Sequence, residues 1–83
     1  MQVQVRYFAS LREALGPSET LALAPDATVA SVRDALIARS PAHARVLARG
    51  RAVRVALNQA LCDESAPVAA DAEVAFFPPV TGG

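Results

Sequence analysis

The segment VQVRYFA, residues Val3–Ala9, alternates between apolar and polar side chains with a period of two. Side chains two residues apart lie on the same face of a β-strand, so Val3, Val5 and Tyr7 share one face. We therefore predict a half-buried strand whose valine face packs on the core. Phe8 falls on the opposite face, which points away from the core.

The rest of the sequence continues with short strand patterns around one clear helical pattern. Thr28 is a favourable N-cap, and Val29, Val32 and Leu36 follow it at helical spacing, with Arg33 off that apolar face. Pro41 disfavours helix at the residue before it. We expect further strands at 20–24, 52–58, near 61 and at 73–77, and helices at 10–15 (capped by Ser10) and 28–40, with another helical turn at 42–48.

This order of elements predicts one small domain. Two strands, a main helix and two or three more strands bury their apolar faces best as a mixed sheet packed on that helix. A chain of 83 residues leaves no room for a second domain. We expect an α+β roll over residues 1–77 and an extended tail over residues 78–83.

Composition excludes some classes of function and sets the default location. The formal net charge is zero, so we expect neither nucleic acid nor a membrane surface as a partner. All eight basic residues are arginine, and a chain without lysine cannot form a lysine Schiff base. Cys62 is the single cysteine, so no internal disulfide can form, and a cytoplasmic location is expected.

No pattern inside the domain predicts an active site or a metal site. His43 has no acidic or cysteine partner at ligand spacing, so we expect it at the surface or at a helix cap. Cys62 lacks a second cysteine at Cys-x-x-Cys spacing and is expected to pack as a small apolar residue. The glycines form no phosphate-binding loop. We expect this chain by itself to bind no cofactor and to be non-catalytic.

Two phenylalanines fall on the wrong side of their strands for burial. Phe8 lies on the outer face of the first strand. In the last strand, Val74 and Phe76 face the core, so Phe77 lies on the outer face. If these two strands are neighbours, both aromatic rings lie on one exposed sheet surface. Exposed aromatic clusters are frequent at protein interfaces, so we expect a partner there.

The last residues of the sequence, FFPPVTGG, suggest chemistry at the terminal carboxyl group. Pro78 and Pro79 favour an extended chain, and six residues at about 3.3 Å each can reach about 20 Å. Gly82 and Gly83 have no side chains, so they can enter a narrow channel and leave the carboxyl carbon open to attack. A carboxylate must first be activated, for example as a mixed anhydride with AMP, and another protein has to supply that activation.

At these residues the chain resembles the ubiquitin-like sulfur carriers of the MoaD/ThiS family. The resemblance rests on YFASLRE, VALNQ and DAEVAFFPPVTGG, and the ending FFPPVTGG is similar to the molybdopterin synthase small subunits within that family. It implies a β-grasp fold, as in ubiquitin. It also implies that Gly83 is adenylated, converted to a thiocarboxylate, and donates sulfur to cyclic pyranopterin monophosphate during molybdenum cofactor biosynthesis.

The resemblance also implies partners and interface residues. The partners would be the large synthase subunit, in a heterotetramer, an adenylyltransferase of the ubiquitin-activating type that uses ATP and magnesium, and a cysteine desulfurase or rhodanese-like sulfur relay. Gly83 would carry the sulfur and Gly82 would keep the approach narrow. Other residues would line the inserted tail (Pro78, Pro79, Val80 and Thr81) or form the interface (Phe8, Leu61 and Phe77).

Three alternatives remain open from the sequence. The same chemistry could serve thiamine thiazole synthesis or transfer-RNA thiolation, and the activated glycine could acylate a lysine of another protein. A non-catalytic β-grasp binding module with an inert tail would need only the exposed sheet surface. The role of Gly83 discriminates between the carriers and the binding module.

Overall fold

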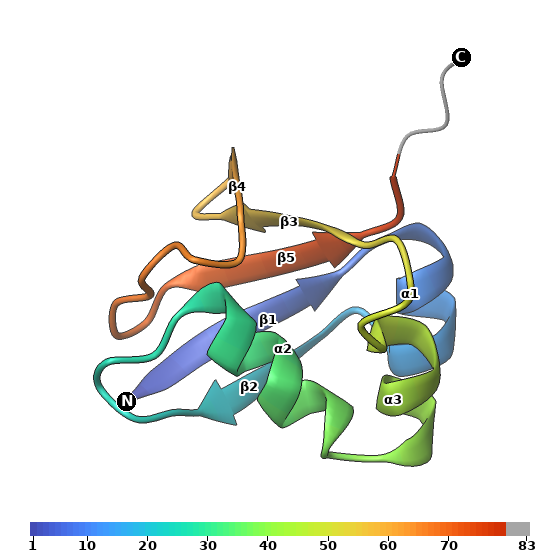
Figure 1. Ribbon diagram of the computed structural model, residues 1–83, viewed down its shortest axis with the longest axis horizontal. Helices are drawn as coiled ribbons and strands as arrows, with labels where there is room; N and C mark the ends of the chain where they lie inside the picture. Colours follow the sequence, from blue (N-terminus) through green and yellow to red (C-terminus); the bar gives the residue numbers. More distant parts are fainter. Residues whose placement is uncertain (80–83) are drawn as a thin grey trace.

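The computed structural model describes residues 1–79 of the chain and shows a single mixed sheet of five strands in the order β2-β1-β5-β3-β4. The central strands β1 and β5 are parallel, and all other neighbouring strands are antiparallel. Figure 1 shows the elements in chain order, which are β1 (Gln2–Tyr7), α1 (Ala9–Leu15), β2 (Ser18–Ala22), α2 (Val29–Ile37), α3 (Pro41–Leu47), β3 (Arg54–Leu57), β4 (Ala60–Cys62) and β5 (Glu73–Phe77).

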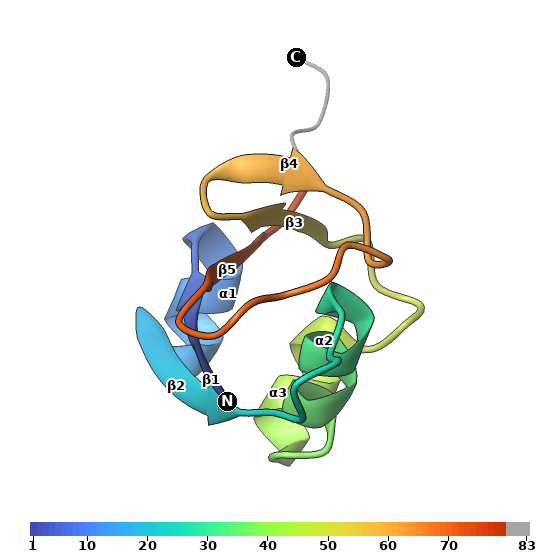
Figure 2. The ribbon, with the colours of Figure 1, turned by 90° about the vertical axis from the view of Figure 1, so that its left-hand side faces the viewer.

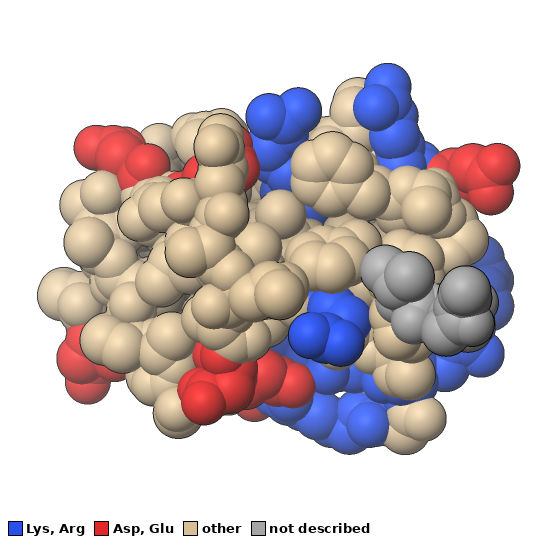
Figure 3. All heavy atoms as spheres, turned by 90° about the horizontal axis from the view of Figure 1, so that it is seen from above, with Lys and Arg blue, Asp and Glu red and all other residues tan. Residues whose placement is uncertain are grey.

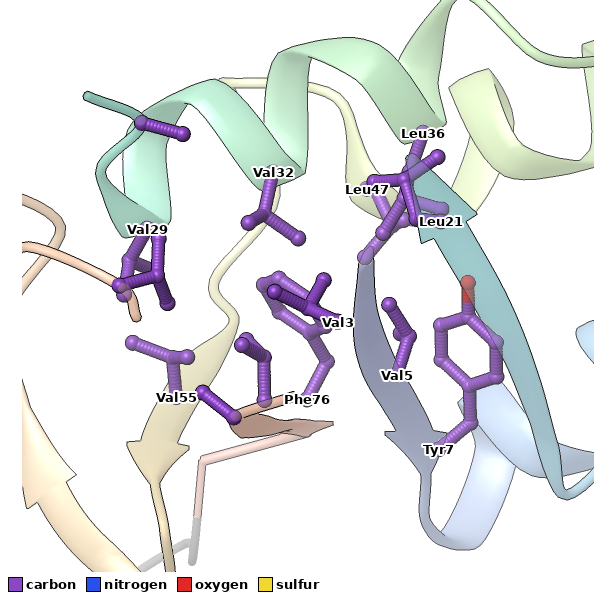
Figure 4. Close-up of a cluster of buried hydrophobic side chains, with 14 of the residues drawn as sticks. Val3, Val5, Tyr7, Leu21, Val29, Val32, Leu36, Leu47, Val55 and Phe76 are labelled. Atoms are coloured by element: carbon purple, nitrogen blue, oxygen red, sulfur yellow. The ribbon is translucent and has the colours of Figure 1, made fainter. Parts of the chain in front are cut away.

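The sheet curves around one helical layer, with α2 and α3 on the same side of it (Figure 2). The core lies between this layer and the sheet, where Val29, Val32 and Leu36 of α2 point toward strand residues such as Val3 and Phe76 (Figure 4). β1 alternates between exposed and buried residues along its whole length. The predicted α+β roll on one main helix is therefore confirmed, and the seven-residue α3 replaces the single helical turn expected there.

The start of α2 follows the predicted capping. The Thr28 hydroxyl accepts a hydrogen bond from the backbone N–H of Ser31 at 3.4 Å, and the Ser31 hydroxyl accepts one from the Thr28 N–H at 3.1 Å. Each side chain satisfies a donor that the first helical turn leaves unpaired. The helix ends at Ile37, earlier than predicted, because a turn separates it from α3, which Ser40 caps and Pro41 begins.

The bounds of α1 and β2 also differ from the sequence prediction. Phe8, and not Ser10, is the N-cap of α1, although Gly16 ends this helix as expected, with a φ of 90° that favours glycine. β2 begins at Ser18 and ends at Ala22 because it pairs residue by residue with β1, from Arg6↔Ser18 to Gln2↔Ala22. Its polar first residues join the strand through this pairing, which a search for apolar alternation does not detect.

Asn58 and Gln59 form the two-residue turn between β3 and β4. Their φ angles of 50° and 71° are both positive, as a type I′ hairpin turn requires. The Asn58 side-chain oxygen accepts a hydrogen bond from the backbone N–H of Glu73 at 2.9 Å, so the turn is also tied to the start of β5. The predicted turn and the short strand around Leu61 are confirmed, and β3 is shorter than the predicted 52–58.

Ala75 is buried, although its position on the outer face of β5 predicts exposure. β5 is the middle strand of the sheet, so Ala75 lies between Arg6 on β1 and Ala56 on β3. The small side chain of Ala75 therefore has a residue of a neighbouring strand on each side. The bounds predicted for this strand, 73–77, agree with the structure.

Arg33 is 4% exposed, which contradicts its predicted position off the buried face of α2. Its guanidinium donates to the backbone oxygens of Leu47 and Ala48, both at 2.7 Å, and to the Glu64 carboxylate at 2.9 Å. A third backbone oxygen, that of Arg51, accepts from it at 3.2 Å. The connection from α3 to β3 folds over Arg33, and this guanidinium satisfies the carbonyls that the connection buries.

Candidate functional site

The candidate site is the end of β5 and the sheet surface beside it. The N–H of Phe8 donates to the backbone oxygen of Phe76 at 3.1 Å, so the pairing of β1 with β5 continues to their last residues. Pro78 and Pro79, both half-buried, follow without regular structure, because proline has no N–H to continue a ladder. The predicted sulfur-carrying residue and most of the predicted tail lie outside the described residues (Val80, Thr81, Gly82 and Gly83).

The structure brings the three predicted interface residues to the outer face of the sheet. Phe8 and Leu61 are the large apolar side chains most exposed among the described residues, at 40% and 65%, and Phe77 is half-buried. Leu61 pairs with Ala56, which pairs with Ala75, so small side chains connect β4 to the middle of this face. We call Phe8, Leu61 and Phe77, with the alanines between them, the outer patch.

The position of Phe8 follows from β1 although the residue itself caps α1. The Arg6 guanidinium carbon lies 5.7 Å from the centre of the Phe8 ring, which places the ring on the Arg6 side of the sheet. β1 and β5 are neighbours with Tyr7 opposite Phe76, so Phe8 and Phe77 leave the sheet at the same end. The first and last strands are therefore neighbours, as the shared surface of Phe8 and Phe77 requires.

A polar cluster on the core side supports this end of β1. The Glu19 carboxylate accepts hydrogen bonds from the Tyr7 hydroxyl at 2.6 Å and from His43 Nε2 at 2.7 Å, and it pairs with Arg39 at 3.2 Å. His43 Nδ1 lies 2.7 Å from the Ser40 hydroxyl. The cluster connects β1, β2 and α3 through Tyr7, Glu19 and His43. Tyr7 is the residue directly before Phe8.

The cluster changes the acidity of its members. Partial burial alone raises the pKa of the Glu19 carboxyl, but hydrogen bonds from Tyr7 and His43 and the nearby charges of His43 and Arg39 outweigh it, so this pKa lies below its ordinary value of 4.5. Burial, followed by the contact with Glu19, raises the pKa of the Tyr7 hydroxyl. Glu19 is thus held ionised and Tyr7 neutral.

We predict that Glu19→Gln makes stability less dependent on pH in the acid range. A carboxyl whose pKa is lower in the folded protein adds stability above its unfolded pKa and loses it as pH falls through the folded pKa. The wild type should therefore lose stability below about pH 4.5, and the variant should show a shallower loss there. Urea unfolding between pH 3 and 7 measures this, with Glu13→Gln in α1 as the matched control. Equal slopes for wild type and Glu19→Gln would contradict the prediction.

The sequence did not indicate this cluster. His43 is in the first turn of α3, as the helix-cap expectation allowed, but its side chain is only 13% exposed and has an acidic partner in Glu19. These two residues are 24 positions apart, so no local spacing marks them as a pair. Cys62 is half-buried and packs against the core as predicted.

Within residues 1–79, no group of three side chains has the arrangement needed to hold a metal ion, and no pocket is present. None of the described helices is long and apolar enough to cross a bilayer.

Comparison with known proteins finds relatives that match nearly the whole chain. The ThiS family model matches residues 5–83. A curated relative from Escherichia coli, a molybdopterin synthase sulfur carrier subunit, is 40% identical over 98% of this chain and 99% of its own. A small archaeal modifier protein from Haloferax volcanii, a solved structure, is 30% identical with a TM-score of 0.81 over 95% of this chain and 98% of its own. A complex of subunits 1 and 2 of the molybdopterin-converting factor from Helicobacter pylori contains a chain 26% identical, with a TM-score of 0.70 and full coverage of both. The predicted β-grasp fold is confirmed by these structural neighbours.

Proposed function

Because this chain belongs to the ThiS family, we propose that it is the sulfur carrier subunit of a molybdopterin synthase. The observation that carries the proposal is the 40% identity, over nearly the full length of both chains, to a relative of that name. The family match extends through residue 83, so it includes the Gly-Gly that the chemistry needs. The solved complex from Helicobacter pylori supports a large subunit as the partner.

In this function Gly83 is the reacting residue. An activating enzyme uses ATP and magnesium to join the terminal carboxylate to AMP, which makes the carboxyl carbon electrophilic. The outer sulfur of a persulfide, supplied by a cysteine desulfurase or a rhodanese-like protein, then attacks this carbon and displaces AMP, which gives an acyl disulfide. A second thiol cleaves the S–S bond, which releases the thiocarboxylate and leaves a disulfide on the sulfur donor. The large subunit receives the tail and directs this sulfur to cyclic pyranopterin monophosphate. ATP availability and a reducing environment favour the cytoplasm as the location.

The intact mass of the protein tests this proposal directly. The untagged protein is incubated with its activating enzyme, ATP and a sulfur source, and we expect a mass gain equal to the replacement of one oxygen by sulfur, located at Gly83. No change in mass, with the activating enzyme shown competent on another carrier, would refute sulfur carriage. The thiocarboxylate is then supplied to candidate large subunits, and formation of molybdopterin separates this function from thiazole and transfer-RNA thiolation.

The outer patch is the proposed docking surface for the large subunit. It combines exposed apolar side chains with a strand end that leads straight into the tail, so docking would also position Gly83. Aromatic and aliphatic anchors that become fully covered supply most of the affinity of such interfaces. Pro78 and Pro79 would limit the directions that the tail can take and so reduce the entropy lost on insertion.

We predict that Leu61→Asp weakens binding to the large subunit at least tenfold, roughly 1.4 kcal/mol or more, because it would bury an unpaired carboxylate in an apolar contact. Leu61 is 65% exposed, so the fold should be unaffected. Isothermal titration calorimetry measures the affinity. Ala70→Asp, an equivalent change at an exposed position in the loop before β5, is the control. Unchanged affinity in Leu61→Asp would exclude the outer patch as the docking surface.

The similarity to a small archaeal modifier protein favours a second use of the same activated glycine. An acyl adenylate reacts with a lysine amine to give an amide and AMP, so Gly83 could become attached to another protein. This chain has no lysine, so it cannot be extended into a chain of copies through its own side-chain amines. Adducts of higher mass that require Gly83 and ATP, but no sulfur source, would identify this use.

A further inference from the structure

Arginines border the outer patch at the end where β1 and β5 finish. Figure 3 shows arginine side chains gathered in the half of that view nearer the end of β5, while most acidic side chains lie in the other half. The net charge of the chain is zero, so this is a separation of charge and not an excess. A protein with such a separation has a positive end that attracts anionic surfaces at a distance.

Arg54 lies beside the outer patch in strand register. It lies directly opposite Phe77, at the first position of β3, and on the same face of the sheet. It is exposed, and within residues 1–79 it forms no ion pair or side-chain hydrogen bond. Arg33 and Arg49, by contrast, are engaged with acidic side chains of the domain. Nothing in the described fold therefore requires a cation at position 54.

Arg6 lies on the other side of β5, opposite Ala75, and makes two contacts within the domain. It lies against the Phe8 ring and 3.6 Å from Glu73, which neutralises part of its charge. Arg6 and Arg54 flank the middle of the outer face from β1 and β3, with β5 between them. Two guanidiniums beside the exposed Phe8 and the half-buried Phe77 form a surface that fits carboxylates around an apolar contact.

We propose that the large subunit carries acidic side chains facing Arg54 and Arg6, and that these pairs steer the association of the two subunits. This inference rests on the proposed function, because it specifies the chemistry of the partner's docking surface. Charges at the rim of an interface act mainly on the association rate, and salt screens them. The apolar centre of the patch then provides the lasting contact.

The experiment measures association rate constants with the large subunit by stopped-flow at about 50 mM and about 500 mM salt. Arg54→Glu is compared with Arg45→Glu, which makes the same change of charge at an exposed position in α3. We expect Arg54→Glu to lower the association rate about tenfold at low salt and less than about twofold at high salt. Arg45→Glu should change it less than about twofold at either salt concentration. Thermal unfolding of both variants verifies that the fold is retained.

Each outcome separates this inference from the function on which it rests. Equal association rates for Arg54→Glu and Arg45→Glu, with normal binding by the wild type, would overturn only the steering role of Arg54. A slower rate for Arg54→Glu with the activating enzyme alone, and not with the large subunit, would overturn the choice of partner. Failure of the wild type to bind any large subunit would remove the proposed function and this inference together.

Discussion

Deletion of Gly83 is expected to abolish thiocarboxylate formation and reduce molybdopterin synthesis at least a hundredfold, while leaving the fold intact. Removing one residue withdraws the terminal carboxyl group by about 3.5 Å from the position where an activating enzyme must hold it. Misplacement of a reacting group by about 1 Å can already cost about a hundredfold in rate. The core is built from residues between Val3 and Phe76, so loss of Gly83 removes no core contact.

Two measurements test this expectation together. Intact mass after incubation with the activating enzyme, ATP and a sulfur source should show the sulfur gain in the wild type and none in the deletion variant. An added alanine after Gly83 should have the same effect, because the activated carboxyl group then belongs to a residue with a side chain. Thermal unfolding should be unchanged in both. Normal molybdopterin formation by the deletion variant would eliminate Gly83 as the sulfur carrier and favour a binding module with an inert tail.

Replacement of Arg33 by methionine is expected to cause the largest loss of stability from a single polar change, about 3 kcal/mol. Methionine keeps much of the length of the side chain but removes every donor. Three backbone oxygens in the connection from α3 to β3 then lose their partner, and the Glu64 carboxylate loses its contact with this buried cation. For a domain of this size the unfolding temperature should fall by about 15 °C.

Arg45→Met is the matched control for Arg33→Met, because Arg45 is exposed and its replacement removes the same charge. It should change stability by less than about 0.5 kcal/mol. Hydrogen exchange should increase in Arg33→Met at the residues before β3, which the guanidinium holds against α2. A loss of stability below about 1 kcal/mol in Arg33→Met would mean that the connection satisfies its carbonyls without this side chain.

The features predicted correctly from the sequence are those that depend on neighbouring residues. Alternation over Val3–Tyr7 identified β1 and its buried face, and the bounds of β5 agree with the structure. The Thr28 cap depends on a residue three positions away and was also predicted correctly. Parity along two strands placed Phe8 and Phe77 on the outer face, and pairing of β1 with β5 then brought them to one end of the sheet.

The errors concern residues whose environment comes from distant parts of the chain. Arg33 is buried by backbone 14 residues later and by a carboxylate 31 residues later. Glu19 belongs to β2, which begins earlier than predicted, and it bonds to Tyr7 and His43 because β1, β2 and α3 converge there. Ala75 is buried because β5 has a neighbouring strand on each side. Hydrophobic periodicity and composition indicate which side chains of an element can be buried. They do not indicate which distant residues cover those side chains.

The same division between what nearby residues determine and what distant residues determine applies to the candidate site. The Pro-Pro and Gly-Gly residues predict an extended tail with an open terminal carboxyl, and this chemistry follows from the backbone and side chains of those residues alone. Only the tertiary structure decided which side chains surround the base of the tail. The parallel pairing of β1 with β5 and the antiparallel pairing of β5 with β3 place Phe8, Phe77 and Arg54 together. Strand order is set by the packing of the whole sheet on α2, so it cannot be predicted from the local properties of any one segment.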